Sequence, residues 1–98
     1  ICLGYADGYP RNASWTDAST GGSAIIGGIV CPFAGSVSMD LIIVDVTEVP
    51  SPGAKRGDPV TLIGGALDLE TVGAGAKTIG YEILTSLGRR YARRYVGL

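Results

Sequence analysis

Residues 24–31, AIIGGIVC, place Gly27 and Gly28 between two short apolar runs. Glycine adopts positive φ at no steric cost, and both central residues of a type I′ hairpin turn need positive φ. The segment therefore predicts two antiparallel strands, 24–26 and 29–31, joined by a two-residue turn. Short apolar segments separated by turn-forming residues continue along the chain, which favours a β-dominated domain.

Further strands are expected on both sides of this hairpin. Residues 1–5, ICLGY, form an apolar run that ends at the turn-forming residues 7–10. Residues 37–49 are rich in β-branched side chains and are expected to form the core strand. Residues 60–63, VTLI, predict one more strand, whereas residues 12–23 are polar and are interpreted as a surface loop without regular structure.

The last third of the sequence predicts two short helices. Over residues 68–77, Asp68 is suited to cap the helix amino terminus, and apolar residues follow at helical spacing. A second helix is expected over residues 80–87, with Gly88 as its carboxy-terminal cap. The tail is interpreted as an arginine-rich strand or an extended arm. The predicted fold class is mainly β, a small β-barrel-like domain with one or two short helices.

Composition limits the classes of function that are open to the chain. With 98 residues, 46% of them hydrophobic and 17% charged, we expect one packed domain over residues 1–98. A net charge of -1 gives no general reason to expect nucleic acid or an anionic membrane as the main ligand. The sequence contains no histidine, which excludes Ser-His-Asp and Cys-His catalysis and any histidine-based metal site.

Cysteine usage and the amino terminus suggest a cellular setting. Cys2 and Cys31 are too few for a secreted disulfide scaffold and are expected to be free thiols in a reducing cytosol. No apolar run is long enough to cross a bilayer, and no targeting segment is recognisable, so we expect a cytoplasmic protein. The chain opens at Ile1 inside an apolar run, as expected of a domain trimmed from a longer protein.

Two segments could carry chemistry. Residues 4–11 place Tyr5, Tyr9 and Arg11 around a tight turn, where phenol and guanidinium groups could meet a small anion. The simpler interpretation is a hairpin with one tyrosine in the core. In residues 36–40, the backbone N–H groups could bind a carboxylate if the start of the strand is left unpaired. The simpler interpretation there is a core methionine and a turn aspartate.

Taken in order, four blocks of the sequence resemble one family. They are residues 4–11 (GYADGYPR), 35–40 (GSVSMD), 57–64 (GDPVTLIG) and 78–85 (TIGYEILT). This succession resembles the carboxy-terminal domain of alanine racemases, the pyridoxal-phosphate racemases of fold type III. The resemblance covers essentially all of the chain except residues 12–23.

The resemblance implies an activity, a cofactor and a partner. Alanine racemases hold pyridoxal 5'-phosphate as a Schiff base on a lysine of an amino-terminal barrel, and they interconvert L- and D-alanine. The product serves D-alanine biosynthesis and hence peptidoglycan precursors. Family members are homodimers in which this domain completes the active site on the barrel of the partner subunit. Neither a membrane nor a nucleic acid is expected as a partner.

The resemblance also assigns roles to residues of this chain. The backbone N–H of Met39 is expected to bind the substrate carboxylate, and Asp40 to help hold that turn. Tyr5 is expected to line the narrow substrate channel, with Arg11 further out along it. Many family members carry arginine where this chain has Ser36, so an ion pair in the channel is not expected here.

The family's proton-transfer residues are not matched in this chain. They are the barrel lysine and a tyrosine shortly upstream of residues 4–11, and both positions precede Ile1. Neither Lys55 nor Lys77 matches the cofactor-binding lysine, so we expect no catalytic residue here and no activity from the chain alone. Arg89 aligns loosely with a tyrosine that some members place near the cofactor phosphate.

Two other interpretations stay open on the sequence. One is a small β-barrel that binds nucleic acid or another protein through the basic tail, because Tyr91 and Tyr95 lie among four arginines, and aromatic and guanidinium planes stack on bases. The four are Arg89, Arg90, Arg93 and Arg94. The other keeps the fold and changes the substrate, as in serine or broad-specificity amino-acid racemases.

Overall fold

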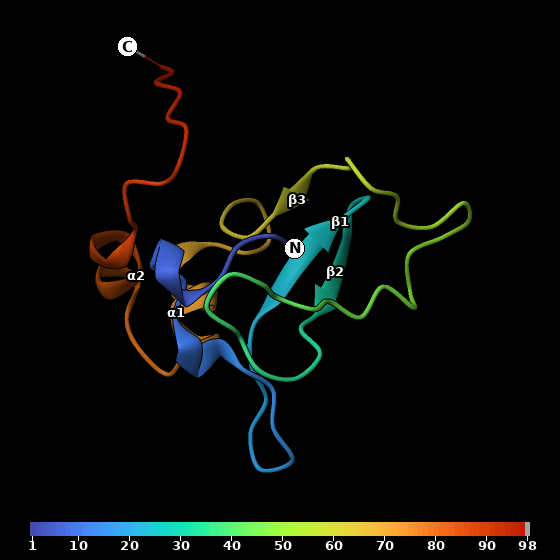
Figure 1. The fold of residues 1–98 in the computed structure, drawn as a ribbon, viewed down its shortest axis with the longest axis horizontal. Helices are drawn as coiled ribbons and strands as arrows, with labels where there is room; N and C mark the ends of the chain where they lie inside the picture. The colour runs from blue at the N-terminus through green and yellow to red at the C-terminus, as the bar shows by residue number, and fades with distance from the viewer. Residues whose placement is uncertain (98) are drawn as a thin grey trace.

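The computed structural model describes residues 1–97 and centres on the predicted hairpin (Figure 1). Strand β1 (Ser23–Ile26) pairs antiparallel with β2 (Ile29–Pro32), with Ile26 opposite Ile29. The two turn glycines have φ of 57° and 78°, which confirms the glycine turn that the sequence predicts. On its other side β1 pairs with β3 (Val60–Thr61), so the sheet order is β2-β1-β3.

The predicted strand 60–63 is present but shorter than expected. Only its first two residues pair with β1, and Leu62 and Ile63 leave the sheet as half-buried core residues. The three strands form an open antiparallel sheet that does not close into a barrel. With its two short helices, the domain otherwise has the mainly β fold that the sequence predicts.

The prediction of a core strand over residues 37–49 is wrong. This segment makes one bridge, between Phe33 and Val44, and the chain folds back on itself where the Ser38 N–H donates to the Leu41 carbonyl at 3.0 Å. Val37 and Ile42 are fully buried, as a core segment requires. The segment therefore contributes two buried side chains to the core without continuous pairing to a neighbouring strand.

The prediction of a first strand over residues 1–5 is also wrong. Ile1 exchanges two backbone hydrogen bonds with Ile42, at 2.7 and 3.0 Å, and regular pairing then stops. The chain instead enters a 3-10 turn, η1 (Tyr5–Asp7), which ends at Gly8 with φ of 90°. A second 3-10 turn, η2 (Arg11–Ala13), follows. The loop predicted over residues 12–23 is therefore shorter than expected, because its first two residues belong to η2 and its last belongs to β1. Within it the structure adds a bridge between Thr16 and Ser19.

Both predicted helices are present. In α1 (Leu69–Gly75), the Asp68 carboxylate accepts from the Thr71 N–H at 2.8 Å, which confirms the predicted cap. Helix α2 (Gly80–Ser86) ends differently from the prediction, because Leu87 is its extended cap residue. Gly88 does not adopt the left-handed cap conformation, and its N–H donates to the Asp7 carbonyl at 3.0 Å. From there the described part of the tail runs as an extended arm (Figure 1).

The core lies between the sheet and the two helices. It includes Phe33, Ile42, Val72 and Ile83, all buried. The rings of Tyr9 and Phe33 meet edge to face with centroids 5.7 Å apart, and burial raises the pKa of Tyr9 to about 12.

The environment of the thiols and the length of the helices also bear on the sequence predictions. Within residues 1–97 neither cysteine forms a disulfide; Cys2 is exposed and Cys31 is buried, as expected of free thiols. No helix in this part of the chain combines the length and the apolar character needed to span a membrane.

Ile42 and Ile43 are neighbours with opposite exposure and so provide a matched test of the core. Ile42 is 1% exposed and Ile43 is 68% exposed. Ile42→Ala should lower the free energy of unfolding by about 2–4 kcal/mol because it leaves a cavity, while Ile43→Ala should change it by less than about 0.5 kcal/mol. Urea unfolding of the 98-residue chain measures both values. Equal losses would contradict this assignment of the inward face.

Candidate functional site

A tight turn at residues 38–41 forms the centre of the candidate site. The Ser38 N–H donates to the Leu41 carbonyl at 3.0 Å, so Met39 and Asp40 are the central residues of the turn. Both are exposed, Met39 by 53%. Among the described residues, the N–H of Met39 has no acceptor. An unpaired backbone N–H in an exposed turn is chemically suited to bind a carboxylate.

The 3-10 turn η1 is tied directly to this turn by its backbone. The Tyr5 N–H donates to the Ser38 carbonyl and the Ala6 N–H donates to the Met39 carbonyl, each at 3.0 Å. Gly4 lets the two segments approach, because a Cβ there would collide with the Ser38 carbonyl oxygen and lie 2.5 Å from that of Met39. The structure therefore brings Tyr5 and Met39 together, although they belong to different sequence blocks.

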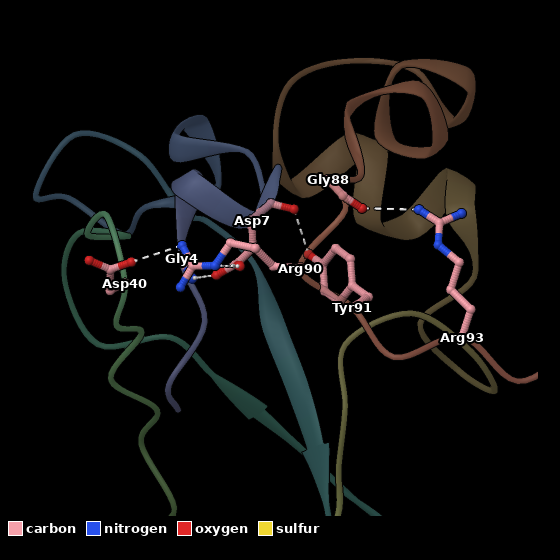
Figure 2. A network of polar contacts seen from close by, with 7 residues as sticks. All are labelled: Gly4, Asp7, Asp40, Gly88, Arg90, Tyr91 and Arg93. Carbon is pink, nitrogen blue, oxygen red and sulfur yellow. Dashed lines mark hydrogen bonds and ion pairs between the residues drawn. The ribbon is translucent and has the colours of Figure 1, made fainter.

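Asp7 links η1 to the carboxy-terminal tail. Its side chain is buried, and one carboxylate oxygen accepts from the Gly4 N–H at 3.1 Å. The other pairs with Nε of Arg90 at 3.0 Å. The same guanidinium reaches the turn, because Nη1 of Arg90 lies 3.2 Å from Oδ1 of Asp40 (Figure 2). One arginine thus joins two carboxylates from two segments.

The backbone of Asp7 holds the tail as well. Its carbonyl oxygen accepts from the Tyr91 hydroxyl at 2.7 Å and from the Gly88 N–H at 3.0 Å. Burial and the nearby Asp7 carboxylate raise the pKa of Tyr91, against a smaller lowering by Arg90. Figure 2 shows Arg93 on the other side of Gly88, whose carbonyl it contacts at 3.0 Å.

Sequence reasoning missed Asp7, Arg90 and Tyr91 as members of this network. Asp7 stands in a turn-forming cluster, and its sequence context does not distinguish a buried aspartate from an exposed turn aspartate. The sequence predicts an arginine-rich strand or an extended arm for the tail, and neither prediction includes the pairing of Arg90 with Asp7 and Asp40 that the structure shows. Arg89, the tail residue considered in the sequence, is exposed and lies outside the network.

Arg11 lies in a separate region, in η2. Together with Ser36 and Lys77 it lines an open pocket of about 350 Å³. Ser14 joins η2 to the segment before the turn, since its hydroxyl donates to the Arg11 carbonyl at 2.6 Å and accepts from the Val37 N–H at 2.8 Å. The structure therefore does not bring Arg11 into the network around Asp7, but it does place Arg11 and Ser36 at one pocket.

These features define a small, mainly β domain whose surface turn can receive a carboxylate. The chain belongs to the family of alanine racemase carboxy-terminal domains, because the family described as "Alanine racemase, C-terminal domain" matches residues 1–95. This match confirms the resemblance inferred from the four sequence blocks.

Curated relatives agree with this assignment. The chain is 54% identical over 96 residues to the alanine racemase of Methylobacterium nodulans, which covers 98% of this chain and 25% of that protein. It is 46% identical over 93 residues to the alanine racemase of Rickettsia canadensis, which covers 95% of this chain and 25% of that protein. The chain therefore spans about a quarter of the length of the relatives it matches.

Solved structures show the same fold. Alanine racemase from Bartonella henselae, with covalently bound pyridoxal phosphate, matches with a TM-score of 0.86 at 46% identity, over 98% of this chain and 26% of that one. The biosynthetic alanine racemase from Pseudomonas aeruginosa matches with a TM-score of 0.82 at 41% identity, over 98% of this chain and 25% of that one.

The contact between η1 and the turn can be tested through its glycine. Gly4→Ala should lower the free energy of unfolding by about 1–3 kcal/mol, because the added methyl group forces two backbones apart. Gly75→Ala in α1 is the matched control, because the nearest atoms to the added Cβ would lie 3.4 Å away, at ordinary van der Waals distance. This substitution should leave the free energy of unfolding unchanged or raise it by up to about 1 kcal/mol. Urea unfolding compares them, and an unchanged midpoint for Gly4→Ala would show that the two segments are not in contact.

Proposed function

We propose that residues 1–98 are the carboxy-terminal domain of a pyridoxal-phosphate-dependent alanine racemase, which interconverts L- and D-alanine. The observation that carries the proposal is the N–H of Met39, which has no acceptor among residues 1–97 and belongs to an exposed turn that hydrogen bonds and an ion pair hold in place. Membership of the alanine racemase family supplies the reaction class. In this proposal the domain contributes substrate-binding groups and no proton-transfer residue.

The cofactor does not fit the residues of this chain alone. Lys55 is exposed in a loop, where its backbone N–H donates to the Asp58 carboxylate. The side-chain amine of Lys77 lies 3.5 Å from two backbone carbonyl oxygens. Neither lysine stands in an enclosed site that could hold pyridoxal phosphate. We therefore assign the cofactor to an amino-terminal barrel domain, where it would act as the electron sink for the reaction at Cα.

Each predicted site residue receives a role that its position supports. The N–H of Met39 binds the substrate carboxylate, and Asp40, paired to Arg90, steadies the turn. Tyr5 is half-exposed at the edge of the turn, where its ring can narrow the access of substrates. Arg11 stands further out with Ser36 at the pocket beside η2. The approach of Arg89 to a cofactor phosphate stays a prediction.

The partner in this proposal is a second copy of the same protein. Next to the turn, Leu41 is 55% and Ile43 is 68% exposed, and Met39 continues the same apolar segment. Three large apolar side chains exposed within five residues favour burial against another protein. A homodimer in which this surface meets the partner's barrel would complete each active site.

We further propose a cytoplasmic enzyme that supplies D-alanine for peptidoglycan precursors.

The nucleic-acid-binding alternative is not favoured. Arg90 is paired with two carboxylates, Arg93 contacts the Gly88 carbonyl, and the Tyr91 hydroxyl donates to Asp7. The basic and aromatic groups on which that alternative rested are therefore partly engaged within the domain. The alternative of a serine or broad-specificity racemase keeps every feature of this site and differs only in substrate.

Racemisation is tested by comparing the full-length protein with the isolated chain. With pyridoxal phosphate, the full-length protein should interconvert L- and D-alanine, because the barrel supplies the cofactor lysine and the bases. Residues 1–98 with the same cofactor should show no turnover. Chiral chromatography of the products measures both reactions, and serine as second substrate tests the broad-specificity alternative. Turnover by the isolated chain would contradict the placement of the bases.

The role of Tyr5 is tested by widening the substrate channel. In the full-length protein, Tyr5→Ala should raise kcat/KM for serine and larger amino acids relative to alanine by about tenfold, since removing a ring enlarges the space for the side chain. Tyr95→Ala is the matched control, because Tyr95 is exposed on the tail and outside the network. A substrate profile that is identical in Tyr5→Ala and the wild type would refute this role.

A further inference from the structure

We propose that Arg90 is a positioning residue for the turn 38–41, which it holds by pairing with Asp40 on the turn and Asp7 on η1 at the same time. The consequence for the reaction rests on the proposed function, because the position of the turn matters to turnover only if the Met39 N–H receives the substrate. The geometry itself does not depend on that function.

The guanidinium of Arg90 lies between two carboxylates that would repel each other without it. Its Nε is 3.0 Å from Oδ1 of Asp7, and its Nη1 is 3.2 Å from Oδ1 of Asp40 (Figure 2). A guanidinium presents its N–H groups in fixed directions in one plane, so it can bind two carboxylates at a set separation. A lysine has a single nitrogen and cannot reproduce this geometry. Arg90 therefore fixes the distance between η1 and the turn.

The backbone around Arg90 is anchored to the same aspartate. The Gly88 N–H and the Tyr91 hydroxyl both donate to the Asp7 carbonyl, at 3.0 and 2.7 Å. Exposed ion pairs usually contribute little, partly because two long side chains must be ordered. Here Asp7 is buried and the residues flanking Arg90 are already held, so less conformational entropy is lost on pairing. The Arg90–Asp7 contact is consequently stronger than an ordinary surface pair, and it holds the guanidinium within reach of Asp40, whose own side chain is 57% exposed.

Arg90 also compensates the charge next to the proposed substrate-binding group. Asp40 follows Met39 directly, and its carboxylate would repel an incoming substrate carboxylate if it were unpaired. Pairing with the guanidinium reduces this repulsion. Arg90 thus has two effects on one turn: it holds the backbone in position and it lowers the negative potential there.

The first experiment measures the position of the turn without using activity. In the full-length protein, Arg90→Gln should speed hydrogen exchange at the amides of Tyr5 and Ala6 about tenfold, because these amides donate to the turn. Arg93→Gln is the matched control, since within residues 1–97 the one side-chain hydrogen bond of Arg93 goes to the Gly88 carbonyl and not to a carboxylate. Arg90→Lys keeps a positive charge near the buried Asp7 and so protects the fold, yet it should still speed exchange because it cannot bind both carboxylates.

The second experiment measures the effect on the substrate. Arg90→Gln should raise KM for alanine about tenfold, with a much smaller change in kcat, because it weakens binding of the carboxylate. Adding Asp40→Asn to this variant should recover a large part of that loss, since it removes the uncompensated charge. A residue that served folding alone would show no such recovery, because the charge of Asp40 would then have no effect on binding of the substrate carboxylate.

The outcomes separate the two proposals. Unchanged exchange at Tyr5 and Ala6 in both Arg90 variants would overturn the positioning role, as would equal effects in Arg93→Gln. Faster exchange with no recovery in the double variant would overturn the charge effect. A wild-type protein that does not racemise alanine would refute the proposed function instead, and the exchange measurement would still decide whether Arg90 holds the turn.

Discussion

The buried carboxylate of Asp7 is the interaction on which the site depends. Removing an ionised carboxylate from water costs several kcal/mol unless hydrogen bonds and an opposite charge replace the lost hydration. Asp7 is only 5% exposed, and both of its carboxylate oxygens have partners, the Gly4 N–H and Arg90. Its carbonyl oxygen receives two further donors from the tail. Because Asp7 requires these partners, the first residues of the chain and the segment after α2 lie next to each other.

The turn at residues 38–41 takes its position from this arrangement rather than from the sheet. It follows β2 through a single bridge, so strand pairing alone leaves it weakly fixed. Backbone hydrogen bonds of Ile42 with Ile1 and of Ile43 with Ala34 hold the chain just after the turn. Two backbone hydrogen bonds from η1 and the pairing of Asp40 with Arg90 hold the turn itself. Because η1 is itself held through Asp7, the orientation of the Met39 N–H depends on residues far away in the sequence. A binding group on a loop is thus held by contacts with other parts of the chain.

Local features of the fold could be predicted from the sequence, and contacts between distant residues could not. The glycine turn of the hairpin and the Asp68 cap follow from interactions within a few residues, so their patterns are readable. Asp7 and Arg90 are separated by most of the chain, and neither residue carries a local pattern that indicates the other. The roles of Met39 and Tyr5 came from resemblance to a family, whereas the aspartate and arginine that hold the turn became visible only in the structure.

The wrong prediction of a core strand over residues 37–49 has a physical cause that also bears on function. In this segment only Val37 and Ile42 are buried, and the exposed neighbours of Ile42 are Leu41 and Ile43 rather than polar residues. The sequence predicts a strand because β-branched residues are frequent in this segment, and such residues are enriched in strands. In this chain the face with Leu41 and Ile43 is left uncovered. A partner's barrel seated on that face, as in the proposed homodimer, would bury the same residues. The apolar residues that led to the wrong strand prediction are therefore also suited to a subunit interface beside the substrate turn.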